Sequence, residues 1–306
     1  MTLDIQSLLR NMVGKGASDL HVKAGSPPGF RIDGDVVAQE EIGRLLPEHT
    51  VALARQIMSP EQWERFEREK DIDFSYAIKD LARFRVNALH QRGSVGMVIR
   101  QIPDQIPDYR KLGLPQICMD LAAKPRGLVL VTGPTGSGKS TTLAAMIDFI
   151  NQTEHGHILT MEDPLEFVHP DKQCFVTQRQ IGQDCESFRE GLRRALRQDP
   201  DVILIGEMRD LETISMAITA AETGHLVFGT LHTTSAISTV DRIIDVFPTD
   251  AQQQVRVQLA GTLQGVISQT LVPKVGGGRV AAREILVATD AVRSLVREAK
   301  SAQILN

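Results

Sequence analysis

Cysteine is scarce in this sequence, and long apolar runs are missing. Cys118, Cys174 and Cys185 are odd in number, and none belongs to a Cys-x-x-Cys pair. They argue against a disulfide framework and a structural zinc site, and they favour a reducing compartment. Because no run approaches about 18 apolar residues, no segment is expected to span a membrane. Residues 1–15 also lack the apolar core of a signal peptide.

An excess of basic charge is missing too. With 34 Lys and Arg against 38 Asp and Glu, the formal net charge is −4. This balance gives no overall attraction to nucleic acid or to an anionic membrane. Aromatic residues make up only 4% of the chain, and no basic patch is interleaved with them, so binding of single-stranded nucleic acid is not supported. A length of 306 residues suggests about two domains with a sizeable core.

Residues 1–102 predict a small α+β domain. Residues 1–16 have the apolar spacing of an amphipathic helix, and Asp33-Gly34 is a typical hairpin turn. Ser59-Pro60 predicts the start of a helix. Residues 103–117 are rich in proline and predict an interdomain linker, so that the second domain is expected to cover 118–306.

One motif stands out in the second domain. Gly133-Pro-Thr-Gly-Ser-Gly-Lys139-Ser140 fits Gly-x4-Gly-Lys-[Ser/Thr], with an apolar run before it and a helix-compatible run after it. That context is typical of a phosphate-binding loop and is not expected of a chance glycine-rich turn. Glycine allows a positive φ and a close approach to phosphate, while successive N–H groups form an anion cradle at a helix N-terminus. The predicted nucleotide-binding residues are Gly133, Pro134, Thr135, Gly136, Ser137, Gly138, Lys139, Ser140 and Thr141.

The pattern of the chain changes after the linker, where short apolar runs alternate with helical segments. The runs lie at residues 128–132, 157–161, 202–205 and 226–230. They predict a mostly parallel sheet buried on both faces, and so an α/β fold. Towards the C-terminus we expect a helix through Gln252–Thr270, a hairpin turn at Gly276-Gly-Gly278, a strand near Arg283–Val287 and a final helix from about Thr289.

Polar residues follow each of these four runs. The phosphate loop follows the first, and Glu162-Asp163-Pro-Leu-Glu166 follows the second. Glu207 comes shortly after the third run, and His232 after the fourth. Because ligands of open α/β sheets bind beyond the carboxyl ends of the strands, we expect one site with carboxylates opposite the phosphates.

Each acid has a candidate role, because phosphoryl transfer needs a metal that bridges the phosphates and a group that positions water. Lys139 can reach the β- and γ-phosphates. Mg²⁺ would be held by Ser140, waters and Glu207, which follows its strand as a Walker B acid does. Glu166 or Glu162 is the candidate base that orients water, and Asp163 is a further candidate. The alternative for each of these acids is a solvated loop carboxylate.

Histidines and arginines complete the candidates. His232 lies where it can sense the γ-phosphate. His225, roughly 23 Å away at the start of the same strand, is expected to be structural or to serve another surface. Arg193 and Arg197 stand four residues apart on a helix that opens at Ser187. They are either solvated charges or an arginine pair that reaches a neighbouring subunit or a nucleotide.

Several motifs together resemble a known family. Four segments resemble motifs of the type II/IV secretion ATPases. Residues 133–141 resemble the Walker A motif and residues 161–167 the Asp box, while residues 206–210 resemble the Walker B motif and residues 223–233 the His box. Similarity to the type IV pilus retraction ATPases, the PilT/PilU family, is carried further by residues 17–21, 83–87 and 291–298. Gly206 stands where many P-loop ATPases have aspartate, and it agrees with this family's pattern.

The resemblance implies a fold and an assembly. It implies a ring hexamer in which each chain has an N-terminal PAS-like domain and a C-terminal RecA-like P-loop ATPase domain. ATP and Mg²⁺ are the implied cofactors, and ATP lies between the domains in this family. By motif position, the arginines that approach it are Arg85 and Arg100, joined by Arg193 and Arg197. The family also favours Glu166 as the base.

The implied function is a motor ATPase that couples hydrolysis of Mg-ATP to type IV pilus retraction, and so to twitching motility. We expect it in the cytoplasm, at the cytoplasmic face of the inner membrane, with an inner-membrane pilus platform protein as partner and no direct contact with nucleic acid. The alternatives are a pilus accessory or assembly/secretion ATPase, and a nucleotide-dependent scaffold with little turnover. The full set of acids and His232 argues against the scaffold. Three scattered cysteines argue against the assembly branch, whose members often carry a four-cysteine zinc insertion.

Overall fold

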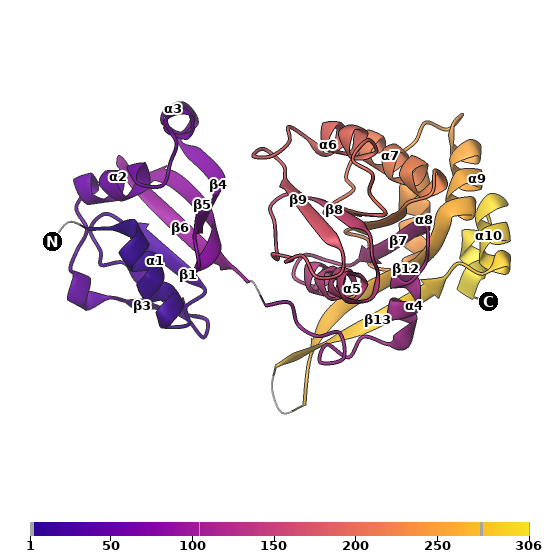
Figure 1. Ribbon diagram of the computed structural model, residues 1–306, viewed down its shortest axis with the longest axis horizontal. Coiled ribbons are helices and arrows are strands. Elements are labelled where there is room, and N and C mark those ends of the chain that lie inside the picture. Colours follow the sequence, from indigo (N-terminus) through magenta and orange to yellow (C-terminus); the bar gives the residue numbers. More distant parts are fainter. Residues whose placement is uncertain (1–2, 104, 276–277, 306) are drawn as a thin grey trace. The chain divides into compact units, whose positions relative to one another are not determined.

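Two compact units make up the chain, Met1–Asp104 and Gln105–Asn306. They are seen in a computed structural model that describes residues 3–103, 105–275 and 278–305. In Figure 1 the first unit is coloured indigo to purple, and the second runs from there to yellow. Within the described residues, no helix is both long and apolar enough to cross a bilayer.

The first unit is built on a six-stranded antiparallel sheet with the order β3-β2-β1-β6-β5-β4. Its strands are β1 (Asp19–Lys23), β2 (Gly29–Ile32), β3 (Asp35–Ala38), β4 (Asp71–Ile78), β5 (Ala82–Gln91) and β6 (Ser94–Ile102). Its helices are α1 (Ile5–Gly14), the short 3-10 helix η1 (Glu40–Ile42), α2 (Pro47–Arg55) and α3 (Pro60–Glu69). Strands and helices share one apolar core that includes Phe30, Phe66 and Phe84. The predicted α+β character of this region is confirmed.

Local sequence accounts for the turns and helix starts of this unit. Asp33 and Gly34 have φ angles of 51° and 99°, the positive values that a tight hairpin between β2 and β3 requires. At α3, the Ser59 hydroxyl accepts from the Gln62 N–H, and the Gln62 side chain accepts from the Ser59 N–H. The predicted hairpin turn and the predicted helix start are both confirmed.

The second unit contains a seven-stranded sheet with the order β13-β12-β7-β11-β10-β8-β9. Its strands are β7 (Gly127–Thr132), β8 (His157–Glu162), β9 (Phe175–Gln180), β10 (Val202–Ile205), β11 (Leu226–Leu231), β12 (Leu263–Pro273) and β13 (Arg279–Val287). Its helices are α4 (Gln116–Ala122), α5 (Lys139–Thr153), α6 (Phe188–Ala195), α7 (Leu211–Glu222), α8 (Ala236–Asp245), α9 (Gln252–Thr262), α10 (Asp290–Arg297) and the 3-10 helix η2 (Ser301–Leu305). The strands pair in parallel except β13, which runs antiparallel to β12.

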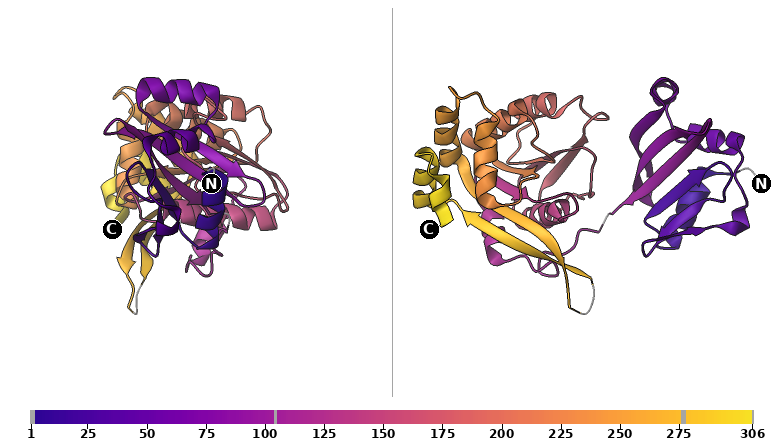
Figure 2. Two further views of the ribbon diagram at one scale, coloured as in Figure 1. Left: turned by 90° about the vertical axis from the view of Figure 1, so that its left-hand side faces the viewer. Right: turned by 180° about the vertical axis from the view of Figure 1, so that it is seen from behind.

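Both faces of this sheet are buried. Leu128 and Leu130 of β7 pack in a core with residues of α6 to α10. Val129 and Val131 point to the opposite face and pack with α4 and α5. The four continuous apolar runs are thus parallel strands covered on both sides, as predicted, and the helices around the sheet can be followed in Figure 2.

The helix expected through Gln252–Thr270 is wrong in its second half. α9 ends at Thr262, and β12 continues from Leu263 as a strand between β7 and β13. Its apolar run suits a buried helix and a buried strand alike. Because β7 would otherwise present unpaired backbone groups at this edge, tertiary pairing selects the strand.

Two further elements differ from the sequence-based picture. β9 was not predicted, because it is mostly polar and carries no apolar run. The turn expected at Gly276-Gly-Gly278 falls on residues 276–277, which lie outside the described residues. On either side of it, β12 and β13 form a hairpin that extends beyond the rest of its unit (Figures 1 and 2). The final helix is confirmed as α10, with Thr289 at its N-cap.

The proline-rich segment expected to be a linker contributes to the second core. Tyr109 and Leu112 pack against α4 and α5, and Leu114 is buried among the same side chains. Arg283 of β13 donates to the carbonyl oxygens of Leu112 and Gly113. The chain from about residue 109 is therefore held by the second unit.

Candidate active site

The sheet order brings four strand ends to one edge. β7, β11, β10 and β8 are consecutive neighbours and parallel, so their carboxyl ends lie side by side. The phosphate loop, His232, Glu207 and the loop after Glu162 follow these ends. The residues predicted from separate parts of the sequence therefore meet on one side of the second unit.

The phosphate loop at residues 133–138 joins the buried strand β7 to α5. Gly133, Gly136 and Gly138 have φ angles of 142°, 78° and 87°, values that residues with a Cβ atom rarely adopt. A Cβ at Gly133 would lie only 2.1 Å from the backbone oxygen of Gln269. Glycine is thus required both by the turn and by the close approach of β12.

Lys139 starts α5 and curls back over the loop. Its Nζ donates to the carbonyl oxygens of Gly133 at 2.9 Å and Pro134 at 3.1 Å. Burial lowers the pKa of Lys139, while the negative charge of Glu207 acts in the opposite direction. Ser140 is exposed on the same turn, and Thr141 is half-buried. The ammonium group is therefore held at the loop without a carboxylate bonded directly to it among the described residues.

Gln269 supports the loop from behind, and the sequence analysis missed it. Its side-chain amide donates to the Ser137 carbonyl oxygen and accepts from the Thr142 hydroxyl. Gln269 reaches the loop because it lies on β12. The sequence predicted a helix over these residues, and that prediction gave no reason to place Gln269 at the loop. A glutamine within the run Leu263–Pro273 offers no signal of its own.

Glu207 is paired with two cationic side chains just beyond β10. His232 Nε2 lies 2.9 Å from Glu207 Oε1, and Arg209 contacts both carboxylate oxygens at 2.6 Å. Burial acts to raise the pKa of Glu207, but the hydrogen bonds and charges of Arg209 and His232 outweigh it, and the pKa is lowered. Two residues predicted from different strand ends, Glu207 and His232, are thus in direct contact.

Arg209 is a second residue that the sequence analysis did not single out. It is largely exposed, and its pKa is raised by the hydrogen bond and charge of Glu207, with a smaller effect from Asp163. It therefore lies in the field of acids from both the β8 and β10 ends. The sequence shows that Arg209 lies two residues after Glu207. That spacing alone does not distinguish a residue of the site from a solvated surface charge.

Glu162, the last residue of β8, is buried and bonded within its own loop. Its carboxylate accepts from the Thr160 hydroxyl at 2.7 Å, the Gln178 side chain at 3.3 Å and the Glu166 N–H at 3.3 Å. Burial raises the pKa of Glu162, and these hydrogen bonds only partly oppose the rise. The last of these bonds ties Glu162 to Glu166, four residues further along the loop. Asp163 and Glu166 themselves are exposed.

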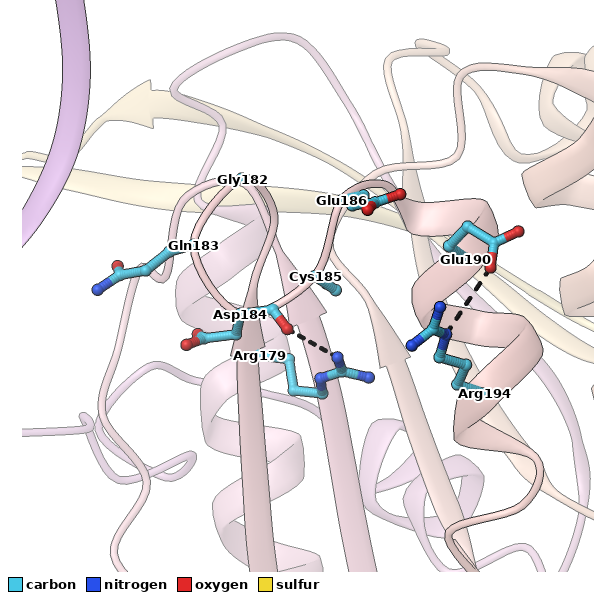
Figure 3. A pocket seen from close by; sticks show the side chains of 8 residues that line it. All are labelled: Arg179, Gly182, Gln183, Asp184, Cys185, Glu186, Glu190 and Arg194. Carbon is cyan, nitrogen blue, oxygen red and sulfur yellow. Dashed lines mark hydrogen bonds and ion pairs between the residues drawn. The ribbon is translucent and has the colours of Figure 1, made fainter. Parts of the chain in front are cut away.

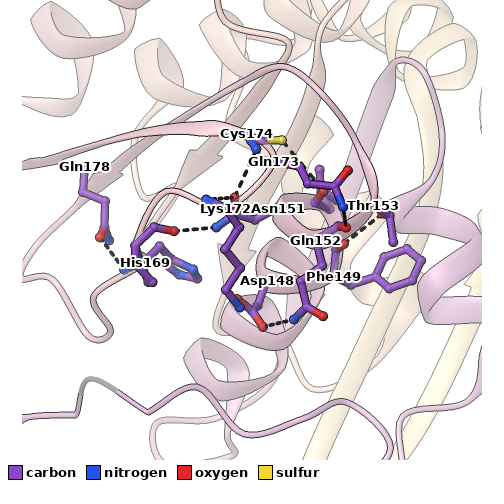
Figure 4. A network of polar contacts seen from close by, with 12 residues as sticks. Asp148, Phe149, Asn151, Gln152, Thr153, His169, Lys172, Gln173, Cys174 and Gln178 are labelled. Carbon is purple, nitrogen blue, oxygen red and sulfur yellow. Dashed lines mark hydrogen bonds and ion pairs between the residues drawn. The ribbon is translucent and has the colours of Figure 1, made fainter.

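A polar network fastens the rest of this loop to α5 (Figure 4). Asn151, which is fully buried, donates to the Pro170 carbonyl oxygen and accepts from the N–H groups of Lys172 and Cys174. The Gln178 side chain on β9 accepts from the His169 N–H and donates to the Phe167 carbonyl oxygen. The helix that begins at the phosphate loop and the loop that carries Glu166 are therefore joined by buried polar contacts.

The four candidate arginines lie on the surfaces of their own units. Arg85 and Arg100 are cross-strand neighbours on β5 and β6. Arg100 Nε contacts the buried Asp19 carboxylate at 2.7 Å, and Arg85 lies 3.6 Å from Asp73. In the second unit, Arg193 lies exposed on α6, 3.6 Å from Glu190. Arg197 is also exposed, in the turn that follows α6.

A separate cavity of about 310 Å³ lies at the loop between β9 and α6 (Figure 3). Arg179 and Arg194 line it, paired with the Asp184 carbonyl oxygen and with Glu190. None of the predicted site residues lines this cavity. In the described parts of the chain, this cavity included, no group of three or more His, Cys, Asp or Glu side chains could hold a metal ion.

The class of protein follows from where the loop lies. A glycine-rich turn between a buried parallel strand and a helix, at the carboxyl edge of a sheet covered on both faces, defines a P-loop nucleotide-binding protein of the α/β kind. Comparison with known proteins is more specific. The family model "Type II/IV secretion system protein" matches residues 1–305, and the chain belongs to that family.

Individual relatives cover nearly the whole chain. The type IV pilus retractation ATPase PilT of Pseudomonas aeruginosa is 54% identical over 302 residues, which is 99% of this chain and 88% of the relative. A twitching motility protein of Neisseria gonorrhoeae is 48% identical over 308 residues, covering 98% and 80%. A crystal structure of the pilus retraction motor PilT with bound ADP has a TM-score of 0.95 at 51% identity and covers 99% of this chain and 88% of that one.

Proposed function

We propose that this protein is a hexameric motor ATPase that couples hydrolysis of Mg-ATP to retraction of the type IV pilus, and so to twitching motility. The observation that carries the proposal is a phosphate loop next to an acid–histidine pair, in a chain 54% identical to a pilus retraction ATPase. The two compact units would correspond to the predicted N-terminal and ATPase domains.

Nucleotide binding would use the loop from Gly133 to Thr141. The positive φ angles of its glycines leave room for phosphate oxygens where a side chain would stand. Backbone N–H groups at the start of α5 and the Lys139 ammonium would hold the negative charge. The present bonds of Lys139 to two loop carbonyl oxygens would be exchanged for bonds to phosphate.

The residues present also fit Mg²⁺. This ion prefers oxygen ligands and keeps several waters when it binds nucleotide phosphates. The exposed Ser140 hydroxyl and the ionised Glu207 carboxylate supply such oxygens, the second through water. When bound, the ion offsets negative charge on the phosphates. Because Arg209 and His232 occupy the Glu207 oxygens, Arg209 would have to swing away for Glu207 to serve this role.

Glu166 is the proposed base that orients water, with Asp163 as the alternative on the same loop. Both are exposed, whereas both oxygens of Glu162 already accept hydrogen bonds within the protein. We therefore assign Glu162 the task of shaping the loop. His232 would hold Glu207 and report on the γ-phosphate.

Ring assembly would complete the site. Four arginines could contribute positive charge that attracts phosphate. They are Arg85 and Arg100 on the first unit and Arg193 and Arg197 on the second. In a hexamer these arginines would approach nucleotide bound at the phosphate loop. The ring would act at the cytoplasmic face of the inner membrane on a pilus platform protein, without direct contact with nucleic acid.

Two measurements test this function: ATP turnover of the purified protein, and the number of pili and twitching of a deletion strain. Purified protein should hydrolyse ATP with Mg²⁺, and Lys139→Ala and Glu207→Ala should each reduce turnover by about 100-fold or more. Lys124→Ala, which removes an exposed lysine outside the site, is the matched control. A deletion strain should carry excess pili without twitching, and the wild-type and Lys124→Ala genes should restore movement, whereas Lys139→Ala should not.

Two outcomes would contradict the proposal in different ways. Undiminished turnover in both Lys139→Ala and Glu207→Ala would refute the catalytic assignment. Loss of pili in the deletion strain would instead indicate an assembly ATPase.

A further inference from the structure

Gln269 of β12 joins the phosphate loop to the first turn of α5 through one side chain. Its Nε2 donates to the Ser137 carbonyl oxygen at 2.7 Å, and its Oε1 accepts from the Thr142 hydroxyl at 2.9 Å. Ser137 belongs to the loop itself, whereas Thr142 lies in the first turn of α5. The contact spans 132 residues of sequence, so it exists only because β12 pairs with β7.

All three partners are inaccessible to solvent. Gln269 and Ser137 are each 3% exposed, and Thr142 is 2% exposed. Water cannot replace a lost partner at such a site, so the amide is held in one orientation. The loop also packs directly on this residue, because a Cβ at Gly138 would lie 3.2 Å from Gln269 Nε2.

The bond to Ser137 controls the direction of an N–H group. The carbonyl of Ser137 and the N–H of Gly138 belong to one planar peptide unit and point in opposite directions. When the carbonyl is anchored on Gln269, the Gly138 N–H is directed away from β12. That is the direction a loop N–H needs in order to meet a phosphate on the other side of the loop.

We propose that Gln269 is a positioning residue for nucleotide, which holds the phosphate loop in its binding conformation before nucleotide arrives. It would not touch the nucleotide, since Ser137 and Thr142 occupy both polar atoms of its amide. Preorganisation of this kind raises affinity because less ordering is needed on binding. The inference rests on nucleotide binding at this loop, which is part of the proposed function.

The test compares two glutamines of the same strand in the full-length protein. Gln269→Leu removes the amide behind the loop. Gln264→Leu removes an amide that donates to the Arg126 carbonyl oxygen at 3.0 Å, at the opposite end of β7. Affinity for the fluorescent nucleotide mant-ADP with Mg²⁺, KM and kcat for ATP, and Tm are measured for both variants.

Gln269→Leu should weaken mant-ADP binding about tenfold and raise KM for ATP by a similar factor, with kcat changed less than about threefold. Gln264→Leu should lower Tm without a change in affinity. Thr142→Val removes the other half of the contact. In the double variant with Gln269→Leu, the two factors should not multiply, since Gln269→Leu already breaks the bond that Thr142→Val removes.

Unchanged nucleotide affinity in Gln269→Leu, with Tm lowered as in Gln264→Leu, would overturn the proposal and leave Gln269 a purely structural residue. If Gln269→Leu does not fold, Gln269→Glu decides. It keeps the acceptor for Thr142 and loses the donor to Ser137, so unchanged affinity would refute the idea equally. A wild-type protein that binds no mant-ADP would refute the proposed function itself.

Discussion

Two glutamates on neighbouring strand ends have pKa values shifted in opposite directions. Burial raises the pKa of Glu162, whereas burial of Glu207 is outweighed by Arg209 and His232, which lower its pKa. Two carboxyl groups whose environments shift their pKa values apart in this way are suited to different roles. The lowered pKa keeps Glu207 ionised, which the role proposed for it at a metal-bound water requires. Glu162 is a buried acceptor that shapes its loop.

Stability should depend on pH through Glu162. Its pKa is raised in the folded protein above the ordinary value of 4.5, so the folded state binds the proton more tightly than the unfolded state does. The contribution of Glu162 to stability is then complete below pH 4.5 and is lost as pH rises through the folded pKa. Glu162→Gln cannot ionise. The difference in Tm, variant minus wild type, should therefore become more positive from pH 4.5 to pH 8.

Thermal unfolding followed across this pH range measures the effect. Glu154→Gln, at an exposed carboxyl after α5, serves as the control for a surface change. A Tm difference for Glu162→Gln that stays constant with pH would show that burial does not raise the pKa of Glu162 in the folded protein.

At the scale of elements, α5 is the part that links phosphate binding to the acidic loop. It begins at the phosphate loop and ends beside residues 168–174, where Asn151 bonds three backbone groups. β9 closes the same loop from the other side through Gln178. A movement of α5 upon nucleotide binding would therefore be passed to the loop that carries Glu166.

Asn151→Ala should loosen this joint. It leaves the N–H groups of Lys172 and Cys174 and the Pro170 carbonyl oxygen without their partner, at a cost of roughly 2–3 kcal/mol in the free energy of unfolding. Thr153→Ala, on the exposed end of the same helix, should cost less than about 0.5 kcal/mol. Urea unfolding gives the two values. Hydrogen exchange should accelerate at residues 168–174 in Asn151→Ala only, and unchanged exchange there would contradict the assigned joint.

At the scale of the whole molecule, the arginines of the first unit have contacts that leave their charge available. Arg100 is anchored by Asp19, yet its side chain is 66% exposed, and Arg85 beside it is 43% exposed. Arg31 lies 3.8 Å from the same carboxylate. Arg31 and Arg100 contact Asp19, and Arg85 contacts Asp73. Three arginines against two aspartates leave a net positive charge on this sheet, which suits an anion supplied from outside the unit.

Mixing two inactive variants tests whether neighbouring subunits share one site. We expect Lys139→Ala and Arg100→Ala each to hydrolyse ATP poorly alone. In a mixed ring, the intact loop of one chain meets the intact arginine of the next at about a quarter of the junctions, so activity should return to that extent. ATP turnover of a 1:1 mixture, after dissociation and reassembly, measures this. Lys139→Ala mixed with Glu207→Ala is the control, because both lesions lie on the same unit and should not complement through Arg100. A mixture no more active than its components would contradict a shared site.

The sequence by itself determined the features that depend on near neighbours in the chain. The glycines and Lys139 of the phosphate loop, the Asp33-Gly34 turn and the four apolar runs can all be read locally, because a turn or a buried strand needs particular residues at particular spacings. The α/β architecture followed from the same runs. Glu207 and His232 could be named as candidates since each comes just after a strand, although their contact could not be predicted.

Only the tertiary structure decided which residues meet across the sheet. The strand order places Gln269 behind the loop and His232 on Glu207, and no local pattern carries that order. The apolar residues of β12 suit a helix as well as a strand. They form a strand because β12 pairs with the backbone of β7. Burial likewise distinguished Glu162 from the exposed Glu166, because access to solvent depends on what the rest of the chain packs against it.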